Sequence, residues 1–187
     1  MKKLIIIISS VITATSFVPL SQAKTGDINF TGSLTAATCS ATAPGSTANN
    51  INVQMGIVSI ADLEDGSTGQ ASATTQLQLD INCTGATSLS NAHMSFDPVS
   101  GSGQDTDDPR LLKINTGGAT GVGVALMDKT DKILNLGAGE RLTTTLTVDG
   151  TGAATAKLDL RAAYIKNGQP LAAGIANASM PFTFIYD

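Results

Sequence analysis

The chain has 187 residues with 11 Lys and Arg, 15 Asp and Glu and one His, which gives a formal net charge of −4 at pH 7. It contains no basic run, and binding to nucleic acid or to an anionic membrane takes clustered Lys and Arg, so neither is expected as a partner. With no Trp, five Phe and two Tyr, the chain must build its core from Val, Ile, Leu and Ala.

The first 23 residues have the parts of a secretory signal peptide. Lys2 and Lys3 form a basic start, an apolar run follows, and Ser21 and Ala23 place small residues where a signal peptidase reads. We expect cleavage after Ala23, with cleavage after Ser16 as an alternative. A transmembrane anchor is disfavoured, because the apolar run is shorter than the roughly 20 residues that span a bilayer.

Beyond this segment, apolar and polar residues alternate with a period of two, which is typical of half-buried β-strands. The alternating segments are residues 28–36, 76–82, 122–126, 142–148, 158–162 and 182–186. Turn-forming residues separate them, and residues 60–64 are compatible with one helical turn. The pattern predicts one all-β sandwich, with no internal domain boundary and no repeat.

The predicted mature chain contains two cysteines, Cys39 and Cys83. In an exported protein an isolated pair is most simply one disulfide. Neither cysteine belongs to a C-x-x-C pair, and only His93 could join them as a ligand, so a zinc site would lack its fourth partner.

Both ends of the predicted mature chain are alternating strands. Terminal strands with open edges template pairing with other chains, so sandwiches usually trim or protect them. Here both ends are suited to pairing between chains. The alternative, that they pair with each other or with neighbours inside one domain, stays open on the residues alone.

Several segments, taken in order, resemble the subunits assembled by the chaperone–usher pathway, which include the type 1-like pilins. The N-terminal strand carries Gly32 seven residues before Cys39, as the family's donor segment does. Near the end, Gly174 is fourteenth from the C-terminus and Tyr186 is penultimate, as in the family's C-terminal signature. The other matching segments are Val53-Gln54-Met55-Gly56, Leu79-Asp80-Ile81-Asn82-Cys83 and Gly121-Val122-Gly123-Val124-Ala125-Leu126-Met127-Asp128.

The resemblance implies an incomplete immunoglobulin-like β-sandwich whose missing final strand is supplied by a chaperone or by a neighbouring subunit. It divides the chain into a signal peptide (1–23), an N-terminal donor strand segment (24–38) and a pilin domain (39–187). The implied donor residues are Ile28, Phe30, Gly32, Leu34 and Ala36. The implied chaperone and acceptor edge consists of Gly174, Phe182, Phe184, Tyr186 and Asp187.

The same resemblance implies a structural subunit of a fimbria on the bacterial cell surface, exported through the periplasm. Its partners would be other copies of itself and related subunits, a periplasmic chaperone and an outer-membrane usher, with a host-surface receptor reached through the fibre. The alternatives are a minor adaptor or terminator, and a one-domain adhesive subunit that binds through loops such as Gly101 to Pro109.

The residues do not suggest an enzyme, and we expect no cofactor, no metal and no catalytic group. His93 is the only histidine, and we interpret it as a polar residue of a strand. Asp105, Asp107 and Asp108 could serve as oxygen ligands for calcium, but they lack the glycine and final Glu of a calcium loop. We therefore expect a solvated turn there.

Overall fold

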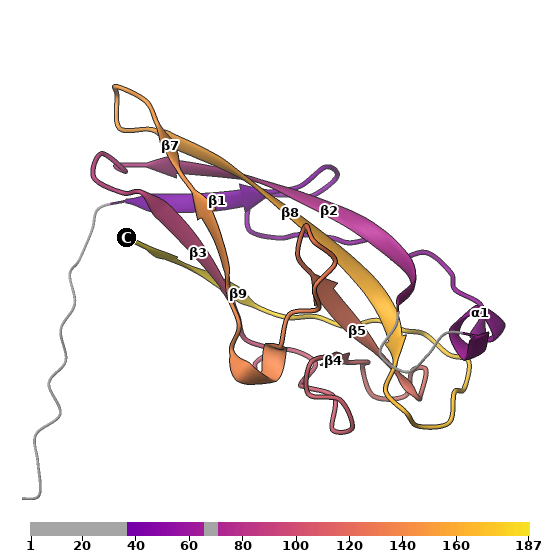
Figure 1. Cartoon of the computed structure of the whole chain (residues 1–187). Coiled ribbons are helices and arrows are strands. Elements are labelled where there is room, and N and C mark those ends of the chain that lie inside the picture. The colour runs from indigo at the N-terminus through magenta and orange to yellow at the C-terminus, as the bar shows by residue number, and fades with distance from the viewer. Residues whose placement is uncertain (1–36, 66–70) are drawn as a thin grey trace, which may run out of the picture. The chain divides into compact units, whose positions relative to one another are not determined.

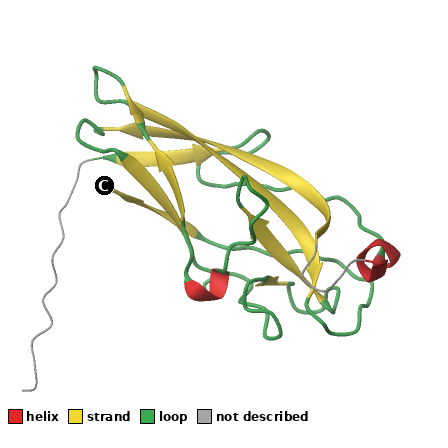
Figure 2. Cartoon of the chain, in the orientation of Figure 1, coloured by secondary structure: helices red, strands yellow, loops and turns green. Residues whose placement is uncertain are grey.

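The computed structural model describes residues 37–65 and 71–187 of the chain (Figure 1). Strands dominate it, with one short α-helix and one short 3-10 helix (Figure 2). The elements are β1 (Thr38–Thr42), α1 (Ile60–Asp65), β2 (Ala71–Thr84), β3 (Asn91–Phe96), β4 (Leu112–Lys113), β5 (Val122–Met127), η1 (Leu136–Ala138), β6 (Leu142–Thr145), β7 (Thr147–Val148), β8 (Ala154–Lys166) and β9 (Phe182–Tyr186).

The strands form two antiparallel sheets. One has the order β1-β2-β8-β5-β4, with β7 also paired to β8, and the other has the order β6-β3-β9. A single buried cluster contains residues of both sheets, including Leu79, Leu160 and Met94, so the sheets enclose a common core. The all-β sandwich predicted from the alternation is confirmed, and the helical turn at residues 60–64 is observed as α1.

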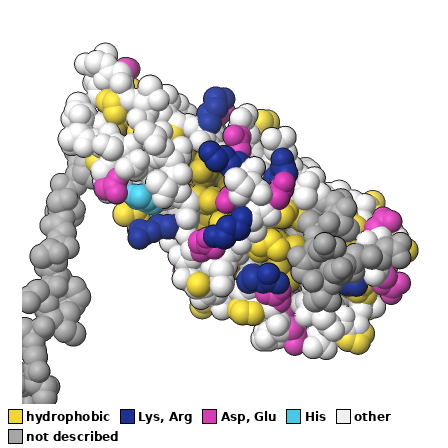
Figure 3. All heavy atoms as spheres, viewed as in Figure 1, with side chains coloured by type: hydrophobic (Ala, Val, Ile, Leu, Met, Phe, Trp, Pro, Cys, Tyr) yellow, Lys and Arg dark blue, Asp and Glu magenta, His cyan; other side chains and the backbone are white. Residues whose placement is uncertain are grey.

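Strand β2 shows how the alternation produces this core. Leu79 and Ile81 are fully buried, while Gln78 and Asp80 lie on the outer face and contact Asp159 and Lys157 of β8. Side chains of opposite charge are interspersed on the face seen in Figure 3, which is the pattern of a solvated surface.

Strand β5 departs from the expectation of one buried face. Val124 and Leu126 pack against the central core, but Ala125 and Met127 are also buried, in a second cluster with Leu111, Ala163 and Ile165. Loops therefore cover the outer face of this part of the sheet, which a period of two cannot reveal.

The alternating segment 142–148 is two strands rather than one. β6 pairs with β3, whereas β7 pairs with β8 in the other sheet. Between them, the Leu146 side chain is buried and its N–H donates to the Ser90 carbonyl oxygen (2.9 Å). The chain thus changes sheets at Leu146 without breaking its alternation.

In the described part of the chain, no helix has the length and apolarity to cross a membrane.

Candidate functional site: an open strand edge beside a hydrophobic groove

A groove of about 1130 Å³ runs between the last strand and the segment that follows β1. Its floor is built from apolar side chains of both sheets, namely Leu77, Leu79, Met94, Phe96, Leu112, Val124, Leu126, Leu160 and Ala162. One rim is residues 49–57, and the other is residues 176–184 with Tyr186. The core of the sandwich is therefore accessible from outside along this line, which favours binding of an apolar, extended ligand.

One rim of the groove carries an unpaired strand edge. β9 pairs with β3 through hydrogen bonds that include Asp187 N–H to Asn91 O (3.3 Å) and Asp97 N–H to Pro181 O (3.0 Å). In an antiparallel ladder, alternate residues point their N–H and C=O groups to opposite edges. The main-chain groups of Phe182, Phe184 and Tyr186 therefore face away from β3, and no strand of the described residues pairs with that edge.

The same three residues supply the aromatic wall of the groove. The ring centroids of Phe182 and Phe184 are 5.7 Å apart in an edge-to-face arrangement, and those of Phe184 and Tyr186 are 6.4 Å apart and stacked. Ile185, between them, is 48% exposed on the opposite face. An incoming strand would thus meet backbone groups and side-chain pockets on the same three residues.

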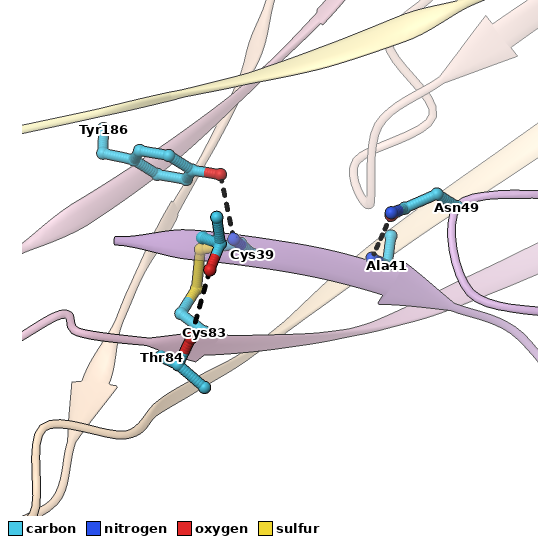
Figure 4. The surroundings of a disulfide bond; sticks show 7 residues. Cys39, Ala41, Asn49, Cys83, Thr84 and Tyr186 are labelled. Atoms are coloured by element: carbon cyan, nitrogen blue, oxygen red, sulfur yellow. Dashed lines mark hydrogen bonds between the residues drawn. A yellow bond between two sulfur atoms is a disulfide. The ribbon is translucent and has the colours of Figure 1, made fainter. Parts of the chain in front are cut away.

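The edge of β1, at the other side of the groove, is protected. Ala41 N–H donates to the Asn49 Oδ1 (3.0 Å), and Asn49 N–H donates to the Ala41 carbonyl oxygen (2.8 Å). Cys39 N–H donates to the Tyr186 hydroxyl oxygen (3.2 Å), and Figure 4 shows these contacts beside the disulfide. Satisfied edge groups do not template pairing, so of the two strand edges beside the groove β9 is the one open to a further strand.

The predicted pair of cysteines forms a disulfide in the structure. Cys39 of β1 and Cys83 of β2 are cross-strand partners, and their bond lies at the same end of the groove as Tyr186. It therefore fixes β1, whose outer edge is the protected one, covalently to β2.

The structure separates the predicted acceptor residues into two groups. Phe182, Phe184 and Tyr186 line the groove, whereas Gly174 and Asp187 are not among its lining residues. A Cβ at Gly174 would lie 2.6 Å from the Ala119 nitrogen, so this glycine permits close backbone packing. The predicted donor residues Ile28, Phe30, Gly32, Leu34 and Ala36 lie outside the described residues.

Asp187 instead anchors the end of β9. Its carboxylate accepts a hydrogen bond from Asn91 Nδ2 (2.8 Å) and contacts His93 Nε2 (2.9 Å), and the other ring nitrogen of His93 contacts the Thr143 hydroxyl (2.8 Å). The hydrogen bonds from Asn91 and His93 hold the pKa of the Asp187 carboxyl below its ordinary value of 3.8. His93 of β3 therefore connects β6 and the end of β9 through its two ring nitrogens.

The loop before β4 differs from the solvated turn expected there. Asp105 is only 6% exposed, and its carboxylate accepts from the backbone N–H groups of Asp107 (2.9 Å) and Asp108 (3.1 Å) and from Asn167 Nδ2 (2.8 Å). Asp108 pairs with Arg110 (2.6 Å), whose hydrogen bond lowers the pKa of that carboxyl. The Asp105 and Asp108 carboxylates therefore stabilise this loop by accepting hydrogen bonds from other residues of the chain.

The rim at residues 49–57 was not predicted as part of the site, although residues 53–56 within it matched the family. Ile51, Val53, Met55 and Ile57 alternate with polar residues or glycine along it, yet the segment forms none of the strands. Asn49 has a φ of 59°, in the left-handed region that Asn tolerates better than most residues. An Asn-Asn pair after a turn was the available signal, but its partner Ala41 could not be inferred from it.

Comparison with known proteins supports the family expected from the sequence. The model of the family described as "Fimbrial protein" matches residues 28–187. Long polar fimbria protein A of Salmonella typhimurium (strain LT2) is 28% identical, over 100% of this chain and 98% of its own length. A type-1 fimbrial protein subunit of Serratia marcescens is 31% identical, over 88% of each chain.

Solved structures show the same fold. The P pilus rod subunit PapA matches with a TM-score of 0.56 and 20% identity, over 74% of this chain and 94% of its own. An antigen and type I fimbria protein of Burkholderia pseudomallei matches with a TM-score of 0.51 and 22% identity, over 80% of this chain and 99% of its own. Fold and sequence together show that the chain belongs to the fimbrial protein family and is a structural subunit of a bacterial surface fimbria.

Proposed function

We propose that subunits join by donor-strand exchange, in which residues 24–38 of one subunit fill the groove of the next. The observation that carries this proposal is the unpaired edge of β9 directly beside an apolar groove. In strand addition of this kind, backbone hydrogen bonds supply much of the affinity and side-chain pockets set the register.

The donor segment has the pattern that such a groove requires. Ile28, Phe30 and Leu34 alternate with polar residues, so all three enter the groove in one register and leave it after a slip by one residue. Each buried Ile, Phe or Leu contributes about 1.5–3 kcal/mol. Gly32 fits where the incoming backbone passes closest to the floor.

The same edge accounts for the proposed chaperone. An exposed groove is an aggregation hazard in the periplasm, so a chaperone strand paired with β9 would protect it until an usher exchanges that strand for the next donor segment. In this proposal Phe182, Phe184 and Tyr186 form the contact edge for both ligands. Basic residues of the chaperone would hold the C-terminal carboxylate of Asp187.

The experiment that tests the proposal is an unboiled denaturing gel of the surface fraction, comparing the native chain with one that lacks residues 24–36. We expect a ladder of detergent-resistant oligomers that disappears on deletion. A matched pair of variants tests the register of the donor strand. Phe30→Ser should shorten the ladder, whereas Thr31→Ala, at an outward position, should not. A ladder that persists after the deletion would contradict donor-strand exchange.

The minor adaptor or terminator is the alternative role within the same family. Only monomer in the native lane would favour it over a major subunit. The one-domain adhesive alternative would use the loop of Gly101 to Pro109, where the Asp105 carboxylate is turned inward rather than offered to a ligand. We assign no catalytic activity to the chain.

A further inference from the structure

Two large apolar side chains are almost fully exposed at one end of the groove. Ile57 is 102% exposed and Ile175 is 72% exposed, whereas most large apolar residues of the described chain are buried or half-buried. Ile57 lies on the rim that follows β1, and Ile175 directly precedes the rim that leads into β9. Both are therefore at the end of the groove remote from Tyr186 and the disulfide.

Both isoleucines are held by the same small cluster. Their neighbours Val58 and Ala176 pack against it, and its buried members include Ile114, Val122 and Tyr164. The Tyr164 hydroxyl donates to the Ala176 carbonyl oxygen (2.9 Å), which fixes the second segment. The two exposed side chains therefore lie next to residues that anchor their segments to the body of the domain.

The donor segment must enter the groove from this end. At the other end the hydrogen bond between Cys39 and Tyr186 joins β1 to the rim of β9, and it would obstruct a chain that leaves the groove there. Entry beside Ile57 and Ile175 also makes the donor antiparallel to β9. This direction matches every other strand pair in the two sheets and gives the more favourable ladder.

The body of the donor subunit must lie close to the groove that its strand fills. Ala36 is the last predicted groove residue, and Thr38 already begins β1 of the donor's own body. Two residues span about 7 Å at most. Ala37, between them, is only 7% exposed within its own body, so it does not act as a free linker. The body of the second copy must therefore lie against the entrance of the groove.

We propose that Ile57 and Ile175 form a contact surface for the body of a second copy of this chain, beyond the contacts of its donor strand. This inference rests on donor-strand exchange as the mode of assembly. The partner is the pole of the second copy from which its strand emerges, where Thr38 begins β1. The surface adds apolar burial outside the groove and limits how far successive subunits can bend relative to each other.

Thiol labelling tests this surface in the full mature chain. Ile57→Cys, Ile175→Cys and, as a control, Val99→Cys are each treated with a maleimide in two states: the polymer, and the monomer kept apart by excess synthetic peptide of residues 24–37. Val99 is 76% exposed in the loop after β3, away from the groove. We expect Ile57→Cys and Ile175→Cys to react about tenfold more slowly in the polymer, because an interface core excludes solvent, and Val99→Cys to react equally in both.

The outcomes separate this proposal from the one on which it rests. Equal labelling of Ile57→Cys in polymer and in peptide-filled monomer would overturn the contact surface while leaving donor-strand exchange intact. Failure of the peptide to bind, together with the absence of a polymer, would overturn donor-strand exchange and the surface with it. As a second measurement, the double variant Ile57→Ser/Ile175→Ser should bind the peptide as the native chain does, yet its ladder should dissociate at a lower temperature.

Discussion

The hydroxyl of Tyr186 accepts a hydrogen bond from the backbone N–H of Cys39 at 3.2 Å, and this contact joins the last strand to the first described strand across the groove. The two residues are 147 positions apart in the chain. The bond satisfies an edge group of β1 (Figure 4), and both of its residues line one end of the groove. A penultimate tyrosine therefore has a role here that phenylalanine could not fill.

Replacing Tyr186 with Phe should expose the Cys39 amide. Loss of this hydrogen bond should cost about 1 kcal/mol of unfolding free energy and speed hydrogen exchange at that amide in the peptide-filled chain. Tyr164→Phe is the matched control, because it removes the bond to Ala176 instead and should leave the Cys39 amide protected. An unchanged exchange rate at Cys39 in Tyr186→Phe would show that the contact does not protect the edge.

The unfolding free energy lost on replacing Asn49 should depend on how well the new residue tolerates a positive φ. Asn49→Ala removes the acceptor for Ala41 N–H and places at a positive φ a residue that tolerates it less well than Asn, so we expect a loss of about 1–2 kcal/mol. Asn49→Gly removes the same acceptor without the backbone strain and should cost less. Chemical denaturation of both variants gives the comparison, and equal losses would contradict the strain component.

Substitutions at adjacent positions of β9 should differ strongly in their effect on donor binding. Phe184→Ala removes a groove wall and should weaken binding of the peptide of residues 24–37 by about 2–4 kcal/mol. Ile185→Ala lies on the outer face and should change it by less than about 0.5 kcal/mol. Calorimetric titration of each chain measures both, and similar losses would argue against the assigned groove face.

The disulfide should contribute strongly to the stability of the body. Cys39 and Cys83 are 44 residues apart, and the chain-entropy model assigns about 4 kcal/mol to closing a loop of that length. We expect the double variant Cys39→Ala/Cys83→Ala to unfold at a correspondingly lower denaturant concentration. Addition of a reductant should lower the denaturation midpoint of the native chain but not that of the double variant. An equal response in both chains would show that the reductant does not act through this disulfide.

The end of β9 should loosen in acid. Because the pKa of Asp187 is lowered on folding, its contribution is fully present above its ordinary pKa of 3.8 and is lost as the pH falls through the lowered value. The difference in melting temperature between pH 5 and strongly acidic solution should therefore be smaller for Asp187→Asn than for the native chain. Other carboxyls with lowered pKa values, such as Asp108, act equally in both chains and cancel in this comparison.

Much of the candidate site could be predicted because strand alternation is a local property. Phe182, Phe184 and Tyr186 were expected on one face of a terminal strand, and they line the groove together. Gly174 and Asp187 were grouped with them by resemblance, but their environments depend on distant residues: Ala119 packs on the first, and Asn91 and His93 bind the second. Sequence spacing contains no information on such contacts.

By itself, the sequence determined the all-β class, the inward residues of β2 and β9, the cysteine pair and the fimbrial family, because each is expressed in alternation, spacing or short motifs. Only the tertiary structure decided which strand edge stays open. It also decided that Asn49 protects β1, that residues 142–148 divide between the sheets, and that Ile57 and Ile175 border one end of the groove. These features arise from packing between segments far apart in the chain, where a residue's neighbours, rather than its own pattern, set its exposure and its partners.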